Sequence, residues 1–292
     1  MKPTSSRNFH ALLQTRFAQG FRVCVGLDPE LGKIPQSLNA VTVKGRLVEF
    51  CTKIIEATAP YAAAFKPNSA FFEAHGPAGI EALKLVIGYA KHVAPHIPVI
   101  LDAKRGDIGN TNDGYVTSAF EDLGADAITV APYMGSESLQ PFLNRIEKGI
   151  IILCRTSNPG AAEFQDLWTT ITSEQSRQWG LGHAREVRFY QRIALQVKHS
   201  WNRNRNCLLV VGATAPAELA EVRKLVGPEM TILIPGVGAQ GAKVEDVVPV
   251  AGRNFLVNSS RSIIFASAGT DFEAAAATEA KRLHEEIAKY LK

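Results

Sequence analysis

Short apolar runs rich in β-branched residues alternate along the chain with longer stretches whose apolar positions recur at helical spacing. The eight short runs lie at 22–27, 62–65, 98–101, 127–131, 150–154, 207–211, 231–234 and 254–257. The helical stretches between them include 43–57, 79–93, 111–123, 216–225 and 271–291. This alternation predicts an α/β fold with a parallel sheet covered by helices. Eight repeats favour a closed (β/α)8 TIM barrel over a doubly wound open sheet.

One interval departs from this alternation. Residues 155–206 are too many for a simple crossover, so we expect an insertion after strand five, at roughly 161–206, made of a loop excursion and a helix. An active-site lid and a peripheral elaboration are equally compatible with it. No low-complexity linker or repeat divides the sequence. Residues 1–292 are therefore predicted to form one domain, with a helix before Arg22 that closes the barrel floor.

Composition narrows the class of ligand and the compartment. The 292 residues are 46% hydrophobic with a net charge of +4, and this mild, dispersed basicity suits small anionic ligands better than nucleic acid. The four cysteines occur singly and without a CxxC pair, as is typical of buried thiols in a reducing compartment. The sequence shows neither a secretory signal nor a window of ~18 apolar residues. We therefore expect a cytoplasmic protein with no membrane partner.

The run Asp-Ala-Lys-Arg-Gly-Asp-Ile at 102–108 places an acid, a base and a second acid directly after an apolar strand-like run. Side chains alternate faces in an extended segment, so Asp102 and Lys104 should point the same way. Gly106 lets the chain turn and bring Asp107 back. Such a cluster can handle protons, although a solvated strand-end loop is the alternative for an isolated triplet.

Polar residues also collect at the ends of the other predicted strands. In (β/α)8 barrels the catalytic residues lie at the carboxyl ends of the strands. Charged residues stand at the first three of these ends, namely Asp28, Lys66 and the triplet that begins at Asp102. Strand five is followed by the polar run Arg-Thr-Ser-Asn-Pro-Gly at 155–160. These positions favour one active site at this face of the barrel.

The loops after strands seven and eight predict a phosphate site, because barrels of this type bind phosphoryl groups there. The run Gly-Val-Gly-Ala-Gln-Gly at 236–241 lets backbone N–H groups approach an anion, and Gln240 can donate through its amide. Arg261 offers a bidentate fork, and a helical turn at 260–264 would add its N-terminus. The glycines also match a dinucleotide fingerprint, but only one strand follows and 254–261 holds no acid for a ribose.

Taken together, these motifs resemble the orotidine 5′-phosphate decarboxylase family. The matching segments are Asp102-x-Lys104-x-x-Asp107-Ile108 with Asn110-Thr111, Pro235 to Gln240, and Arg261-Ser262-Ile263. The segments 65–68 and 155–160, with the overall length, are most similar to the longer bacterial (type 2) subfamily. Two departures concern the loop backbone: Gly109 stands where many members have proline, and Ser260 where many have glycine.

The resemblance implies a reaction and its catalytic residues. It implies conversion of orotidine 5′-monophosphate to uridine 5′-monophosphate and CO2 in de novo pyrimidine biosynthesis, with no cofactor and no metal. In that family the lysine at the Lys104 position protonates the pyrimidine C6 carbanion, and the aspartate at the Asp102 position lies beside the departing carboxylate. The residues at the Asp107, Ile108 and Thr111 positions come from the partner subunit of a homodimer.

The resemblance also implies the substrate contacts. These are Asp28 and Lys66 at the ribose, Ser157 at the pyrimidine, Gln240 and Arg261 at the phosphate, and Pro235 in the same substrate-binding set. The chemistry agrees with the catalytic assignments: loss of CO2 from C6 leaves charge that the ring delocalises poorly, so a cation must stand near that carbon. Flanking carboxylates favour the charged form of that lysine.

Two other functions remain open. One is another phosphosugar decarboxylase or aldolase of the same barrel group, which would need added carboxylates for a metal where Lys66 stands. The other is a non-catalytic phosphate-ligand binding protein, which predicts that at least one charged member of the set is lost, and none is.

Overall fold

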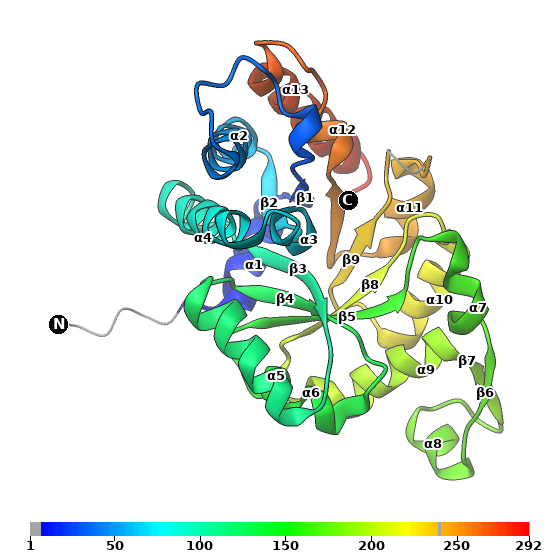
Figure 1. Cartoon of the computed structure of the whole chain (residues 1–292). Coiled ribbons are helices and arrows are strands. Elements are labelled where there is room, and N and C mark those ends of the chain that lie inside the picture. The colour runs from blue at the N-terminus through cyan, green and yellow to red at the C-terminus, as the bar shows by residue number, and fades with distance from the viewer. Residues whose placement is uncertain (1–6, 239–240, 292) are drawn as a thin grey trace.

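Eight parallel strands form a barrel around the apolar centre of the chain in this computed structural model, which describes residues 7–238 and 241–291 (Figure 1). The strands are β1 (Val23–Leu27), β2 (Ala62–Pro67), β3 (Ile100–Arg105), β4 (Ala127–Val130), β5 (Gly149–Arg155), β8 (Cys207–Val211), β9 (Ile232–Pro235) and β10 (Phe255–Ser259). They follow the order β2-β1-β10-β9-β8-β5-β4-β3. Parallel bridges between Phe65 and Val99 and between Asn68 and Asp102 join the two end strands. The predicted TIM barrel is confirmed, and every predicted run overlaps one of these strands.

Helices cover the outside of the barrel. They include α2 (Val43–Thr58), α3 (Ser69–Glu73), α4 (Gly76–Val93), α5 (Gly109–Val116), α6 (Gly135–Leu143), α10 (Pro216–Val226), α11 (Val244–Ala251), α12 (Arg261–Ile264) and α13 (Phe272–Ala288), with the short turn η1 (Leu31–Lys33). Four of the predicted stretches correspond to α2, α4, α10 and α13, and the stretch at 111–123 is α5 continued by the π-helical turn η2 (Thr117–Asp122). The helices α6 and α11 were not among those predicted. Each contains a proline, Pro141 or Pro249, which removes a helix hydrogen bond and weakens the sequence signal.

Helix α1 (Phe9–Ala18) closes the amino-terminal end of the barrel. Its apolar side packs in one cluster with inward side chains of the strands: Phe9, Leu13 and Phe17 with Cys24, Ile100 and Leu233. Gly149 leaves room for the Phe9 ring, because a Cβ at that position would lie 2.4 Å from Phe9 Cδ1. The buried Arg16 side chain donates to the Ala62 carbonyl at the start of β2. The predicted floor helix is confirmed, and it leaves the carboxyl ends of the strands as the open end.

The segment between β5 and β8 forms a small hairpin before it returns to the barrel. Its elements are η3 (Pro159–Ala161), α7 (Ala162–Gln165), β6 (Trp168–Thr170), α8 (Ser173–Gln178), β7 (Glu186–Arg188), α9 (Phe189–Gln196), η4 (Val197–Trp201) and η5 (Asn202–Asn204). Strands β6 and β7 pair antiparallel, and the segment has a small core of its own around Trp179 and Val187. Helix α8 lies at its outer tip (Figure 1). The expected loop excursion and helix are present, with an added hairpin.

In the part of the chain that the structure describes, no helix is both long and apolar enough to cross a membrane.

Candidate active site

A cavity of about 500 Å³ opens at the carboxyl ends of the barrel strands. Each strand, or the residue that directly follows it, contributes to the lining: Asp28 after β1, Lys66 on β2, Asp102 on β3, Thr129 on β4, Leu153 on β5, Val210 on β8, Leu233 on β9 and Asn258 on β10. This volume is in the range of sites for small organic ligands. The cavity therefore lies at the face that the polar strand ends predicted.

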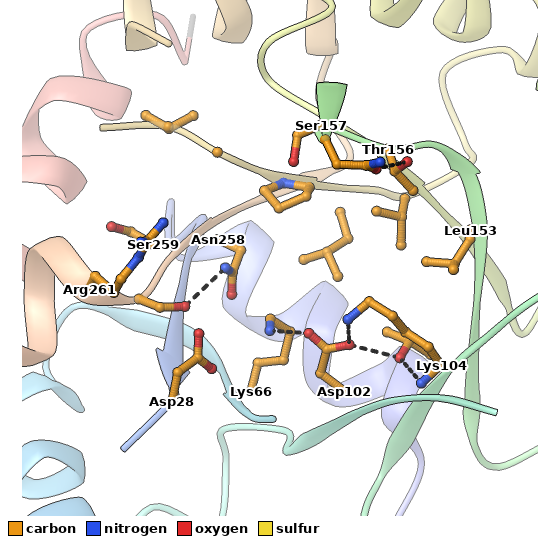
Figure 2. A pocket seen from close by; sticks show the side chains of 18 of the residues that line it. Asp28, Lys66, Asp102, Lys104, Leu153, Thr156, Ser157, Asn258, Ser259 and Arg261 are labelled. Atoms are coloured by element: carbon orange, nitrogen blue, oxygen red, sulfur yellow. Dashed lines mark hydrogen bonds and ion pairs between the residues drawn. The ribbon is translucent and has the colours of Figure 1, made fainter. Parts of the chain in front are cut away.

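Lys66, Asp102 and Lys104 form one charge network in this cavity (Figure 2). Lys66 Nζ lies 2.6 Å from Asp102 Oδ2, and Lys104 Nζ lies 2.6 Å from Asp102 Oδ1. Lys66 and Asp102 are buried, whereas 52% of the Lys104 side chain is exposed. A buried carboxylate thus bridges a buried ammonium group and an accessible one. Both lysines line the cavity, but of the two only Lys104 is also widely accessible to bulk water.

This pairing fixes two protonation states. Burial disfavours the ionised form of Asp102, but the charges and hydrogen bonds of Lys66 and Lys104 outweigh it and hold the pKa of Asp102 well below its ordinary value of 3.8. Burial also disfavours the charged form of Lys66, yet the nearby carboxylates of Asp102 and Asp28 outweigh that effect and raise the pKa of Lys66 above its ordinary 10.5. Near neutral pH, Asp102 is therefore ionised and Lys66 protonated.

Strand β3 departs from a regular ladder where the network lies. Its register to β4 shifts between Leu101 and Arg105, so that three residues of β3 face Thr129 alone. Lys104 has a φ of +49°, in the left-handed region that non-glycine residues seldom adopt. Asp102 and Lys104 do point the same way, as predicted, but a bulge brings them together rather than simple alternation along a strand.

Asp107, Ile108 and Thr111 lie outside the cavity of their own chain. Asn112 on α5 holds this loop: its Oδ1 accepts from Asp107 N at 3.1 Å, and its Nδ2 donates to the Asp107 carbonyl at 2.6 Å. Asp107 Oδ1 in turn accepts from Ile108 N at 2.7 Å. The expectation that Gly106 turns Asp107 back into the charge network is therefore wrong for a single chain, because Asn112 keeps that loop outside.

Ser157 lines the cavity from the loop after β5, and the inserted segment supports this loop. Gln165 on α7 binds Thr156 through both ends of its amide: Oε1 accepts from Thr156 N at 2.8 Å, and Nε2 donates to Thr156 Oγ1 at 2.9 Å. Arg155 donates to both carboxylate oxygens of Asp166, at 2.8 and 3.1 Å. Of the insertion, which the structure describes completely, only Gln165 lines the cavity. Its base therefore supports the site, while its hairpin is peripheral.

The loops after β9 and β10 line the side of the cavity away from Lys104 (Figure 2). Pro235, Gly236 and Arg261 contribute to this lining. Gly236 has a φ of +102°, a backbone conformation that glycine adopts readily and other residues do not. The helical turn predicted at 260–264, directly after the strand that is now β10, is α12. The remaining predicted anion ligand, Gln240, lies outside the described residues. A glycine loop and an exposed guanidinium thus flank this end, where an anion fits.

Two buried oxygen atoms face the cavity with no hydrogen-bond partner among the described residues, Asp28 Oδ1 and Asn258 Oδ1. Figure 2 shows both side chains beside Lys66. Because buried polar atoms in folded proteins are nearly always paired, these acceptors are suited to donor groups of a ligand, such as hydroxyls.

The polar lining residues that were not named among the predicted site residues include Thr129, Gln165 and Asn258. Thr129 is the polar residue in the apolar run at 127–131, and Asn258 directly follows the predicted run at 254–257. The sequence pattern could therefore have identified both as site residues. Gln165 left no such signal, because it reaches the cavity through the tertiary packing of the insertion.

Within the described ranges, no three His, Cys, Asp or Glu side chains gather as a protein-held metal site would need. In the cavity both carboxylate oxygens of Asp102 already accept from lysines. The position at the end of β2, where a metal-dependent enzyme of this barrel group would place a carboxylate, is Lys66.

Comparison with known proteins gives a consistent result. The sequence model of the Orotidine 5'-phosphate decarboxylase / HUMPS family matches residues 22–278. The chain is 46% identical to an orotidine 5'-phosphate decarboxylase of Herpetosiphon aurantiacus over 254 residues, which are 87% of this chain and 88% of the relative. It is 43% identical to one of a Janthinobacterium species over 281 residues, 94% of this chain and 95% of the relative. Among solved structures, the OMP decarboxylase of Leishmania donovani superposes with a TM-score of 0.80 at 39% identity, covering 97% of this chain and 99% of that one.

Proposed function

This chain belongs to the orotidine 5′-phosphate decarboxylase / HUMPS family, and from that premise we propose how its cavity performs the reaction. The activity is that of a carboxy-lyase, which converts orotidine 5′-monophosphate to uridine 5′-monophosphate and CO2 in pyrimidine biosynthesis. The observation that carries the assignment of roles is the Lys66–Asp102–Lys104 network, in which a buried carboxylate holds an accessible ammonium group inside the cavity.

Lys104 is the general acid of the proposed mechanism. When the bond from C6 to the carboxylate breaks, CO2 leaves and the bonding electron pair stays on C6, in an orbital that the ring delocalises poorly. An ammonium group placed at C6 stabilises this charge as it develops and then donates its proton to the carbon. The exposed Lys104 side chain afterwards regains a proton from water. The step needs no cofactor.

Asp102 and Lys66 prepare this step. Asp102 ties down the Lys104 ammonium group before substrate arrives, so that little reorganisation is needed as the charge develops. Lys66 keeps Asp102 ionised from the buried side. We place the departing carboxylate beside Asp102, because the cavity contains Asp102 and Lys104 side by side.

The remaining lining residues divide among the parts of the nucleotide. We assign the ribose hydroxyls to Asp28 and Lys66, since Asp28 Oδ1 is a buried acceptor without a partner in the described chain. Ser157 is assigned to the pyrimidine. Pro235, Arg261 and, beyond the described residues, Gln240 are assigned to the phosphate end. Phosphate binding remote from C6 supplies binding energy that is used in the transition state.

The proposed active unit is a homodimer in which Asp107, Ile108 and Thr111 complete the cavity of the partner subunit. All three lie outside their own cavity. Apolar side chains on the adjoining loops support an interface there: Ile108 is 53% exposed, Tyr133 85% and Met134 44%. Exposed apolar groups gathered in one region are typical of a surface that another protein covers.

We further propose membership of the longer bacterial subfamily and a cytoplasmic location, with no nucleic-acid or membrane partner. Bacterial relatives that align over most of the chain support the first assignment. Four buried, unpaired thiols among the described residues support a reducing compartment.

The deciding experiment follows the absorbance of orotidine 5′-monophosphate with purified protein, with and without a chelator. We expect turnover that the chelator leaves unchanged. Turnover abolished by the chelator would instead favour the metal-dependent phosphosugar group. Nucleotide binding without turnover would identify a binding protein and overturn the proposed function.

A further inference from the structure

We propose that Thr129 is a positioning residue for this reaction, whose hydroxyl group holds the β3 bulge that presents Asp102 and Lys104 to the cavity. This inference rests on the proposed function and adds a residue that the catalytic motif does not contain.

The Thr129 hydroxyl group makes three hydrogen bonds, all to the catalytic segment. Its Oγ1 accepts from Ala103 N at 3.0 Å and from Lys104 N at 2.9 Å, and it donates to Asp102 Oδ1 at 3.0 Å. A hydroxyl group has one donor and two acceptor positions, so its capacity is fully used. Thr129 is buried at 2% exposure, and no water is needed to explain its hydrogen bonding.

These bonds replace the pairing that the bulge removes. In the described sheet, Leu101 pairs with Ile128 and Arg105 pairs with Val130. The three residues between them on β3 therefore lie opposite a single residue of β4, Thr129. The amides of Ala103 and Lys104 would otherwise lack an acceptor within a ladder, and the left-handed φ of Lys104 adds a conformational cost. A side-chain oxygen at Thr129 satisfies both amides at once, and so favours the bulged conformation.

The same hydroxyl group controls both ends of the Lys104 side chain. It binds the Lys104 backbone directly, and it binds Oδ1 of Asp102, the atom that also accepts from Lys104 Nζ at 2.6 Å. A half-exposed lysine with four rotatable bonds has many conformations available. Thr129 Oγ1 holds both the Lys104 backbone and the Asp102 carboxylate that binds Nζ, so fewer conformations of the Lys104 side chain remain. Nζ then stays where a carbon atom of the substrate can receive its proton.

Packing alone does not explain a threonine at this place. The neighbours of Thr129 on β4, Ile128 and Val130, are buried and apolar, and valine has the same shape as threonine. What valine lacks is the oxygen atom that the bulge uses.

The test compares Thr129→Val, which removes the oxygen atom at constant shape, with Thr129→Ser, which keeps it. We expect Thr129→Val to lower kcat roughly 10²-fold, as misplacement of a catalytic group by about 1 Å does. The KM for orotidine 5′-monophosphate and the calorimetric Kd for uridine 5′-monophosphate should change little, because the phosphate end of the cavity is untouched. Thr129→Ser should retain most of kcat.

The matched control is Thr58→Val, another fully buried threonine, whose hydroxyl group donates to the Ile54 carbonyl within α2. It should lower the melting temperature without changing kcat. If Thr129→Val does not fold, Thr129→Ala and Thr129→Ser are compared below their melting temperatures, and the same dependence on the hydroxyl group is expected.

Two results would overturn the positioning role while leaving the proposed function in place: a wild-type kcat in Thr129→Val, or an equal loss of kcat in Thr129→Ser. Absence of turnover in the wild-type protein would instead overturn the proposed function itself.

Discussion

The ammonium group of Lys104 lies 2.6 Å from the carboxylate of Asp102, two residues earlier on the same bulged strand. The other oxygen of that carboxylate lies equally close to the buried Lys66. One carboxylate therefore links a proton donor at the cavity surface to a fixed charge beneath it.

Replacing Lys104 by alanine should lower kcat by roughly 10²- to 10⁴-fold through loss of the general acid alone. Loss of the cation near C6 should lower kcat further. The fold and the binding of uridine 5′-monophosphate should persist, since the Lys104 side chain is half exposed. Steady-state kinetics and calorimetry measure both. Lys84→Ala is the control: its side chain is 53% exposed and pairs with Asp122 on the outside of the barrel. Comparable turnover in Lys104→Ala and Lys84→Ala would reject Lys104 as the acid.

Replacing Asp102 by asparagine should destabilise the protein by about 3 kcal/mol, because the buried charge of Lys66 loses its ionised partner. Activity should fall with it. Urea denaturation gives the free energy of unfolding, and Asp122→Asn, which breaks the exposed pair with Lys84, should cost less than about 1 kcal/mol. Equal effects of the two substitutions would contradict the buried network.

The stabilising effect of Asp102 should depend on pH on the acid side. Its pKa in the folded protein is depressed below the ordinary 3.8, so the unfolded chain takes up a proton first as the pH falls. The stability contributed by Asp102 is therefore complete when the pH is above the ordinary pKa of 3.8. It is lost progressively as the pH falls through the lower pKa of the folded protein.

On the alkaline side, the raised pKa of Lys66 keeps its contribution complete below about pH 10.5, and that contribution is lost as the pH rises through the folded pKa. The difference in unfolding free energy between wild type and Asp102→Asn should thus be constant from about pH 5 to 9 and shrink below about pH 4. Denaturation curves across this range test it. A difference that grows on acidification would have the wrong sign.

Mixing inactive subunits should restore activity if Asp107 serves the partner's cavity. In a dimer of Lys104→Ala with Asp107→Ala, one site receives Lys104 and Asp107 both intact. Random reassociation of two-fold dimers should therefore recover about a quarter of wild-type activity. Mixing Lys104→Ala with Asp102→Ala is the negative control, because both residues line the cavity of a single chain. No recovery in the first mixture would argue against a shared site.

The base of the insertion should affect substrate binding more than the chemical step. Asp166→Asn weakens the two-pronged contact with Arg155 that holds the Ser157 loop. We expect the KM for orotidine 5′-monophosphate to rise roughly tenfold, about 1.4 kcal/mol, with a smaller change in kcat. Glu174→Gln, which breaks an exposed pair with Arg177 on α8 of the same segment, should leave both constants unchanged. If Glu174→Gln raises KM as much, the hairpin itself takes part in binding.

The sequence by itself determined the architecture, the face that carries the site and the charged residues in it. The spacing of apolar residues over a short segment is enough to predict a strand or an amphipathic helix. The runs that correspond to β1 and β8 could therefore be located within one or two residues. Asp28, Lys66 and Asp102 directly follow the predicted runs at 22–27, 62–65 and 98–101, and the barrel rule places such residues together.

Only the tertiary structure decided how the charged residues meet. The bulge of β3 depends on Thr129, which is on another strand, and the exclusion of Asp107 depends on Asn112 in the following helix. Gln165 reaches the cavity because the insertion folds back on the loop after β5. Each of these is a hydrogen bond that satisfies a backbone group left without a ladder partner or fixes a loop. Such bonds depend on where the chain returns in space, which apolar periodicity does not encode.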